Sequence, residues 1–398
     1  MKKIRPILFL SIVALFCLQA CETFEPVALD DSALLDGPVA GLSAAEHIQF
    51  LKGDASFNNQ IFISSNGLGP LFVATSCGSC HAGDGKGHPF TTLTRFGQTN
   101  ESGNQFLKLG GPQLQHRSVP GFTPEQIPAG ATFSKFTPPA NTGLGFLDAV
   151  SDSDILLFSD PNDLNGDGIS GVPNWVELKA YVMPRDGSVV QNGKYIGRFG
   201  KKAATYNLLQ QTAQAYNQDI GITSTFEPTD TYTGVEIDPE ISNQEIQDVV
   251  FYLKTLKAPI PRKAYGDVLA GKQLFLNVGC GSCHRPEMKT ASTDIQSLSN
   301  KVFYPYTDLL LHDMGSGLDD GYTEGSAKTS EWRTPPLWGL GLSKNSQGGE
   351  YFLLHDGRAK SIEEAIRLHG GEGTKSKESF ESLPAGERKK LISFLESL

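Results

Sequence analysis

The chain has 398 residues, and its 34 Lys and Arg against 44 Asp and Glu give a formal net charge of −10. With 39% hydrophobic and 20% charged residues, its composition is typical of a folded protein and excludes a disordered or fibrous chain. Nucleic acid is excluded as a partner, because phosphate binding requires clustered basic residues and no such run occurs. The length predicts two or three domains, and the 43 Gly and 23 Pro predict many loops.

The first residues predict an export signal. Three basic residues at positions 2, 3 and 5 precede an apolar run over 7–18, which is too short to span a bilayer. The run ends in Leu18-Gln-Ala-Cys21, which resembles the lipobox of bacterial lipoproteins, in which the Cys becomes the first mature residue and carries lipid. We expect residues 1–20 to be a lipoprotein signal peptide, Cys21 to be lipidated and 21–42 to be a linker. Glu22 favours an outer-membrane anchor facing the periplasm; the alternative is a plain secretory signal.

Four of the six cysteines occur in a pattern that appears twice, Cys77-Gly-Ser-Cys80-His81 and Cys280-Gly-Ser-Cys283-His284. It is the C-x-x-C-H signature of covalent haem attachment, in which two thiols bind the porphyrin edge and the adjacent His ligates iron. A single zinc site is one alternative, but the pairs are about 200 residues apart and four-Cys zinc does not need the His. A disulfide within each pair is the other, but that bridge would be strained. The sequence predicts two covalently bound haem c groups.

Helix signals occur in corresponding places around the two motifs. Ser242-Asn-Gln-Glu245 is a capping box that opens an apolar-faced helix ending before Pro259, and residues 384–398 show a similar apolar face. Each resembles the helix that closes a cytochrome c fold. Before the motifs, Gly69-Pro-Leu-Phe72 parallels Gly271-Lys-Gln-Leu-Phe275, and both are predicted as the short helix that precedes haem attachment.

These signals predict a mainly α fold of two cytochrome c-like haem domains with long Gly/Pro-rich loops. The predicted domains are 43–260, which carries a long insertion between about residues 90 and 192, and 261–398.

The insertion contains a candidate calcium loop, Asp163-Leu-Asn165-Gly-Asp167-Gly. Alternating oxygen ligands around a sharp Gly turn are typical of such loops, but the twelfth position is Asn174 rather than a bidentate Glu. Two interpretations stay open. Either Asp163, Asn165, Asp167 and Asn174 bind Ca²⁺, or the segment is a loop of Asx turns.

The sixth ligand of each iron separates an electron carrier from a site that is open to chemistry. Ser361 caps a predicted helix whose apolar face ends at His369, so His369 is a candidate ligand of the second iron; the alternative is a core His bonded to a carbonyl. His312 and Met314 lie in an apolar turn and could face either haem. No residue stands out for the first iron, which we expect to be open.

Several longer sequence segments resemble those of the exported di-haem oxidoreductases, a family described as peroxidases or thiol oxidoreductases. The resemblance covers nearly all of the mature chain. It rests on Asp167-Gly-Ile-Ser-Gly171, Gly197-Arg-Phe-Gly200, Asp219-Ile-Gly-Ile-Thr-Ser224, Tyr306-Thr-Asp-Leu-Leu-Leu-His-Asp-Met-Gly315, Glu331-Trp-Arg-Thr-Pro-Pro-Leu-Trp-Gly339 and His355-Asp-Gly-Arg358.

A more distant resemblance is to the bacterial di-haem cytochrome c peroxidases. His369 stands where those enzymes place a Met ligand, which implies a bis-His second haem of lower potential. Asp219 stands near their proton-moving Glu. The same resemblance places Asn174, Thr334 and Pro336 near an inter-haem calcium and Trp175 between the rings. Arg198, Arg333 and Arg358 are candidate partners of the haem propionates, with surface ion pairs as the alternative.

The resemblance implies that a periplasmic donor, a small cytochrome c or a cupredoxin, reduces the C-terminal haem. Hydrogen peroxide or another small oxidant is then reduced at the N-terminal haem, with Asp219, His312 or His355 moving the proton. The first alternative is a non-enzymatic electron-transfer lipoprotein linked to iron handling. The second is an oxidase of organic or thiol substrates, although the mature domains hold no cysteine outside the haem motifs.

Overall fold

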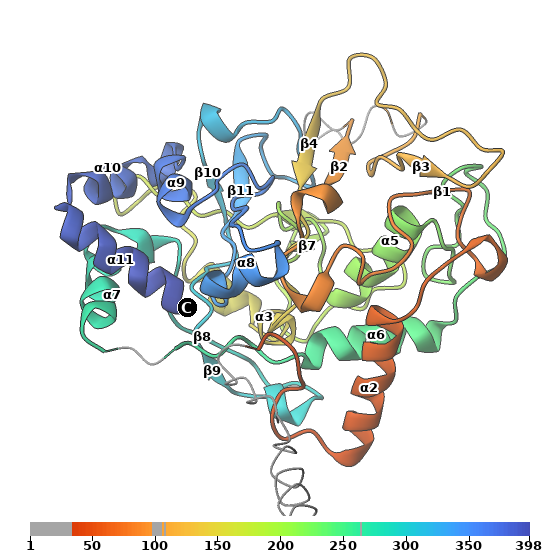
Figure 1. Ribbon diagram of the computed structural model, residues 1–398, viewed down its shortest axis with the longest axis horizontal. Helices are drawn as coiled ribbons and strands as arrows, with labels where there is room; N and C mark the ends of the chain where they lie inside the picture. Colours follow the sequence, from red (N-terminus) through yellow and green to blue (C-terminus); the bar gives the residue numbers. More distant parts are fainter. Residues whose placement is uncertain (1–33, 98–105, 107–108, 263–264) are drawn as a thin grey trace, which may run out of the picture.

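The computed structural model describes residues 34–97, 106, 109–262 and 265–398. The predicted signal peptide, the lipidation site Cys21 and the start of the 21–42 linker lie outside these residues. Short helices and strands are joined by long loops (Figure 1). None of the helices in the described part of the chain is long and apolar enough to cross a membrane.

The N-terminal part is built on two crossed helices, α2 (Ala44–Asn58) and α6 (Asn243–Thr255) (Figure 1). Both begin with a complete capping box, in which the Ser and the third helical Glu satisfy backbone donors that the helix leaves free. The helices touch at Gly53. A Cβ there would overlap the Asp248 carbonyl oxygen and lie 2.6 Å from the Cβ of Tyr252, so only glycine allows this approach.

The C-terminal part repeats this arrangement with α7 (Asp267–Asn277) and α11 (Ala385–Ser397) (Figure 1). Here Gly271 is the contact residue. A Cβ on Gly271 would overlap the Lys390 carbonyl oxygen and lie 2.8 Å from the Cβ of Phe394. In both pairs, therefore, a glycine of the first helix faces a backbone oxygen and, four residues later, an aromatic side chain of the second.

Further helices lie between and around the two pairs. They are α3 (Leu144–Asp148), α4 (Asp152–Leu156), α5 (Leu208–Ile220), α8 (Ser343–Ser346), α9 (Ile362–Arg367) and α10 (Thr374–Ser382). The α5 helix packs against α6, and α9 lies against α10 and α11.

In the described part of the chain, the strands form five small antiparallel sheets, of which four are two-stranded and one is three-stranded. They are β1 (Leu71–Phe72) with β3 (Arg117–Ser118), β2 (Leu93–Phe96) with β4 (Phe133–Phe136), β5 (Trp175–Val176) with β7 (Lys194–Ile196) and β6 (Val190–Gln191), β8 (Met288–Lys289) with β9 (Val302–Phe303), and β10 (Leu311–Asp313) with β11 (Glu331–Arg333).

Two main hydrophobic cores accompany the helix pairs. The first surrounds α2, α5 and α6, and the second surrounds α7, α9 and α11. Residues beyond the predicted boundary at 260, including Leu298, Phe303, Leu310 and Trp338, belong to the first core. The C-terminal part of the chain therefore contributes to the packing of both cores.

Helices dominate the regular structure, as the mainly α prediction states. The helices predicted after Ser242, around Gly271, after Ser361 and near the C-terminus are all present. The helix predicted over Gly69–Phe72 is absent, because Leu71 and Phe72 form β1 and a Cβ on Gly69 would overlap the Gly221 carbonyl. The helix that corresponds to α7 is α2, which ends 19 residues earlier in the chain than Cys77.

Candidate haem-binding site

A cavity of about 950 Å³ contains both C-x-x-C-H motifs. Its wall includes the two cysteines and the histidine of each motif, and all four cysteines are free thiols. Burial raises the pKa of Cys77 and of Cys280 to about 12, so both sulfurs are protonated. In the described residues the four sulfurs do not converge into one ligand set, which disfavours the zinc alternative, and neither pair forms a disulfide.

At the first motif, His81 is held with one ring nitrogen free. Its Nδ1 donates to the Pro139 carbonyl oxygen at 3.0 Å, so Nε2 is the nitrogen left for another partner. Burial lowers the pKa of His81 to about 4, which keeps the imidazole neutral at physiological pH. A neutral, oriented imidazole beside two thiols is the arrangement that haem iron requires on its proximal side.

The second motif repeats this geometry and adds another imidazole. His284 Nδ1 donates to the Tyr306 carbonyl oxygen at 3.0 Å, and His369 Nδ1 donates to the Ala365 carbonyl oxygen at 2.7 Å. Both rings line the cavity, and burial lowers the pKa of each. The two rings lie near enough that a charge on His369 lowers the pKa of His284 further. Two neutral histidines with free Nε2 atoms fit a bis-His haem.

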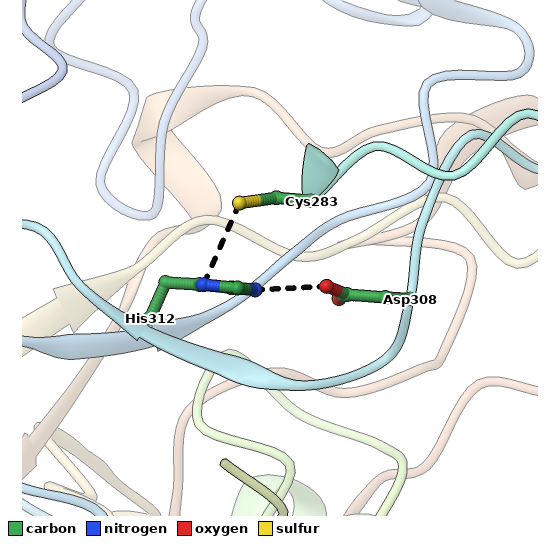
Figure 2. A group of neighbouring side chains, drawn as sticks. All are labelled: Cys283, Asp308 and His312. Atoms are coloured by element: carbon green, nitrogen blue, oxygen red, sulfur yellow. Dashed lines mark hydrogen bonds and ion pairs between the residues drawn. The ribbon is translucent and has the colours of Figure 1, made fainter. Parts of the chain in front are cut away.

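His312 lies beside the second motif but has no free ring nitrogen (Figure 2). Its Nε2 contacts Asp308 Oδ2 at 2.8 Å and its Nδ1 contacts Glu372 Oε2 at 2.6 Å, with Cys283 Sγ 3.5 Å from Nδ1. Burial opposes the charged form, but these carboxylates outweigh it and raise the pKa of His312 well above its usual range. His312 is thus an imidazolium, and its predicted role as a distal ligand has to be revised because neither ring nitrogen is free. It lines the cavity, and its role in moving a proton stays a prediction.

Figure 2 also contains the one group of His, Cys and acidic side chains in the described residues that lies close enough to surround an ion: Cys283, Asp308 and His312. The Cys belongs to the haem motif, and both nitrogens of the His already have carboxylate partners. The group is therefore better described as an ion-pair network that supports the Cys283 segment.

The wall of the cavity near the first motif carries a carboxyl group. Asp219 lies at the end of α5, and its carbonyl oxygen accepts from the amides of Val73 and Ala74, just before Cys77. Asp219 lines the cavity, and its carboxyl has no hydrogen-bond partner in the described part of the chain. Burial raises the pKa of Asp219 to about 7, although the nearby Arg95 guanidinium opposes this shift. Arg95 is itself held by Glu324 and by Gln218.

The chain matches the model of the family described as "Di-haem oxidoreductase, putative peroxidase" over residues 27–99 and 135–398. It belongs to this family. Among solved structures, a chain of Kuenenia stuttgartiensis hydrazine synthase is 13% identical, with 96% of this chain and 97% of that chain covered and a TM-score of 0.41. A MauG-like protein associated with microbial copper homeostasis is 15% identical, with 65% and 89% covered and a TM-score of 0.33. No curated protein matches the chain.

In this di-haem oxidoreductase, the three arginines predicted to pair with propionates differ in their surroundings. Arg198 is buried away from the cavity, where it pairs with Asp152 at 2.5 Å and donates to two carbonyls. Arg358 pairs with Asp320 and Asp356 and does not line the cavity. Both predictions have to be revised, because carboxylates of the protein already bind these guanidinium groups. Arg333 lines the cavity and donates only to carbonyl oxygens.

His355 is oriented by two neighbours. Its Nε2 contacts Asp320 Oδ2 at 2.8 Å, and its ring stacks on Trp332 with 3.7 Å between the ring centroids. Burial lowers its pKa against the pull of Asp320, so the ring is neutral. Met314 lines the cavity and packs against the cluster of Phe136, Leu318, Tyr322 and Trp332. Trp332 lines the cavity, whereas Trp175, predicted to lie between the rings, does not.

The candidate calcium loop satisfies its own backbone. Carboxylate or amide oxygens of Asp163, Asn165 and Asp167 each accept from a backbone amide within the loop. Asn174 is fully buried elsewhere, with its amide oxygen accepting from Ser326 and its amide nitrogen donating to two carbonyls. Its predicted role as a calcium ligand has to be revised, and the loop geometry favours the Asx-turn interpretation. Thr334 and Pro336 line the cavity instead.

The cavity wall also holds basic residues that were not predicted from the sequence, among them Lys86, Arg95 and Lys201. Single basic residues carry no spacing signal. The available hints were that Lys86 follows His81 by five positions and that Lys201 directly follows the Gly197–Gly200 string.

Proposed function

We propose that the chain is an exported di-haem c-type cytochrome that reduces hydrogen peroxide or another small oxidant at its N-terminal haem, with electrons entering at its C-terminal haem. The observation that carries this proposal is the difference between the two sites. The second site offers two free imidazoles, His284 and His369, whereas the first offers His81 and a cavity-facing carboxyl, Asp219. The second site then suits electron transfer and the first suits a reaction.

The residues present fit two covalently attached haems. Cys77 and Cys80 would hold one porphyrin and Cys280 and Cys283 the other, each as thioethers. Bound there, haem would supply the one-electron redox chemistry that no side chain of this protein provides.

The chain's own contribution to the reaction is the handling of protons. Reduction of hydrogen peroxide to two waters consumes two electrons and two protons, and one proton has to move from one peroxide oxygen to the other. Asp219 is suited to this transfer, because a pKa of about 7 leaves both of its forms populated at physiological pH. Arg95 lies close enough to stabilise the carboxylate form after it has lost its proton.

The export signal and Cys21 would place the protein on the outer membrane, facing the periplasm. There a small cytochrome c or a cupredoxin would deliver electrons to the second site. A lipid on Cys21 would hold the enzyme at the membrane while the linker over 21–42 lets the haem domains meet such donors.

Electron paramagnetic resonance of the fully oxidised and half-reduced protein, with and without peroxide, tests this function. We expect one high-spin ferric signal that peroxide removes and one low-spin signal that it leaves unchanged. Two low-spin haems that ignore peroxide in both states would contradict the proposal and favour a non-enzymatic electron carrier.

A further inference from the structure

Three basic side chains line the cavity from separate parts of the chain. Lys86 lies in the loop after the first motif, Lys201 follows Gly200, and Arg333 ends β11. Lys201 and Arg333 are linked by a backbone hydrogen bond, in which the Arg333 amide donates to the Lys201 carbonyl oxygen at 3.0 Å. We call these three side chains the basic cradle.

The basic cradle has no carboxylate bonded to it. Neither Lys86 Nζ nor Lys201 Nζ has a hydrogen bond or ion pair in the described residues, and the Arg333 guanidinium donates only to the carbonyls of Gly200 and Thr334. The acidic group whose charge acts on both lysines is Asp356, which already pairs with Arg358. By contrast, the buried Arg198 and the partly buried Arg95 and Arg185 each pair with an acidic side chain.

Clustered basic side chains without an acidic partner are unfavourable in free energy unless an anion binds beside them. Burial lowers the pKa of Lys86 to about 8 and that of Arg333 to about 10, and burial together with the charges of Lys86 and Arg333 lowers the pKa of Lys201 well below its usual range. Charged groups inside proteins are normally paired, because an unpaired one loses its hydration without compensation. The cradle is therefore complementary to negative charge.

The position of the cradle relative to the first motif indicates which anion this is. Lys86 lies beside the first motif, because the amide of the next residue, Gly87, donates to the Pro138 carbonyl oxygen at 3.0 Å, and the adjacent Pro139 carbonyl holds His81 Nδ1. Lys201 and Arg333 line the same cavity as His81. A haem c attached through its vinyl carbons carries its two carboxylates on the opposite edge of the ring.

We propose that Lys86, Lys201 and Arg333 bind the propionate carboxylates of the first haem, an assignment that rests on the proposed di-haem function. Arg333 also extends the cradle toward the second motif, since its charge is felt by Asp308, the partner of His312. The cradle then fixes the first ring through its carboxylates and surrounds it with positive charge, which favours the reduced iron.

Redox titration of the purified holoprotein tests the assignment. Lys201→Met removes one charge with little change in shape, and we expect the ferric-to-ferrous equilibrium of the first haem to move at least tenfold toward ferric, which is about 59 mV for one electron. Lys86→Met should act in the same direction, and Lys201→Arg should restore the wild-type value. Lys179→Met is the matched control, because Lys179 lines the same cavity but pairs with Glu227 at 3.4 Å.

The measured haem content distinguishes a failure of the proposed di-haem function from a failure of the propionate assignment. A wild-type protein without two covalent haems would refute the proposed function itself. Full haem content with unchanged potentials in both Met variants would refute the cradle alone.

A small diffusible anion is the other source of the same carboxylate or phosphate chemistry. Adding acetate or phosphate to the wild-type protein at constant ionic strength distinguishes the two. An unchanged first-haem potential supports bound propionates, whereas a saturable shift would overturn the assignment.

A variant that does not incorporate haem has no haem potential to measure, so a further experiment uses the wild-type protein alone. Resonance Raman of the haem propionate bending modes in H₂O and D₂O reports hydrogen bonds from exchangeable protons. We expect a solvent-isotope shift for the first haem, and modes insensitive to D₂O would contradict the cradle.

Discussion

The two helix pairs are alike in packing and different in what they place beside the cavity. In α2/α6 and in α7/α11 a glycine brings the helices into backbone contact. A further helix then completes each site. In the C-terminal part α9 ends just before His369, a free imidazole, and in the N-terminal part the last turn of α5 carries Asp219, a free carboxyl. The comparison teaches that the helix pair supports the motif, while the neighbouring helix decides what chemistry the site can perform.

The charged groups around the two motifs also differ in how they are paired. Near the second motif, the His312 imidazolium lies between the carboxylates of Asp308 and Glu372. Near the first motif, the lysines of the basic cradle have no carboxylate bonded to them in the described residues. Positive surroundings favour a reduced iron. The basic cradle would therefore favour electron transfer to the first site, the direction that the proposed function requires.

The largest effect should come from removing one motif at a time. Cys77→Ser with Cys80→Ser should abolish covalent haem at the first site, and the corresponding change at Cys280 and Cys283 should abolish it at the second. Each double variant should retain half of the haem, measured by the pyridine haemochrome spectrum. Only the variant that keeps the first haem should still change its spectrum with peroxide, so a peroxide response in the other variant would reverse the assignment of the two sites.

Replacing Asp219, the carboxyl that distinguishes the first site, should have the second-largest effect. Asp219→Asn should reduce the second-order rate with peroxide about 10²-fold, the lower end of what a proton-transferring group contributes. If Asp219 takes the peroxide proton, only its ionised form is active, so the wild-type rate should rise with pH through about 7 and then level off. The variant should lose this inflection.

Asp84→Asn is the control for that experiment. Burial raises the pKa of Asp84 to about 6, but its carboxylate accepts from the Tyr252 hydroxyl at 2.5 Å and does not line the cavity. This variant should keep the inflection near pH 7. Loss of the inflection in the control as well would mean that the titrating group is not Asp219.

The shared packing of the helix pairs gives the third prediction. Gly53→Ala and Gly271→Ala should each destabilise the protein by about 1–3 kcal/mol, because an added methyl would overlap a backbone oxygen of the facing helix. Gly386→Ala in α11 is the matched control, since nothing lies within 4 Å of its added Cβ and alanine favours the helix. Thermal unfolding of the three variants measures the effect, and equal stability in all three would contradict the close helix contacts.

Local sequence signals predicted the parts of this molecule that depend on local chemistry. The capping boxes and the apolar faces are each fixed within a few residues, and the helices they predict are present. The parallel drawn from Gly69 was wrong, because the segment is extended by its contact with Gly221, about 150 residues away. Nothing near Gly69 in the sequence reveals that contact.

The difference between local signals and long-range contacts also applies to the haem-binding site. The axial candidates His81, His284 and His369 have free nitrogens because backbone carbonyls hold their other nitrogen. His312 looked equally available in the sequence, but its carboxylate partner Glu372 is 60 residues away. Whether a histidine is a ligand or an imidazolium therefore depends on distant partners, which the sequence pattern alone does not specify.

The smallest predicted effect compares two helix caps. Ser242→Ala and Ser361→Ala each remove a side chain that accepts a backbone hydrogen bond at the start of a helix, α6 and α9, and each should cost about 1 kcal/mol of helix stability. The consequences should differ, because α6 holds no candidate iron ligand whereas α9 holds the Ala365 carbonyl that orients His369. Ser361→Ala should therefore give a measurable high-spin fraction at the second haem in the electron paramagnetic resonance spectrum, and Ser242→Ala should leave that signal low-spin. A high-spin signal in both variants would mean that global loosening, rather than the position of His369, controls the second site.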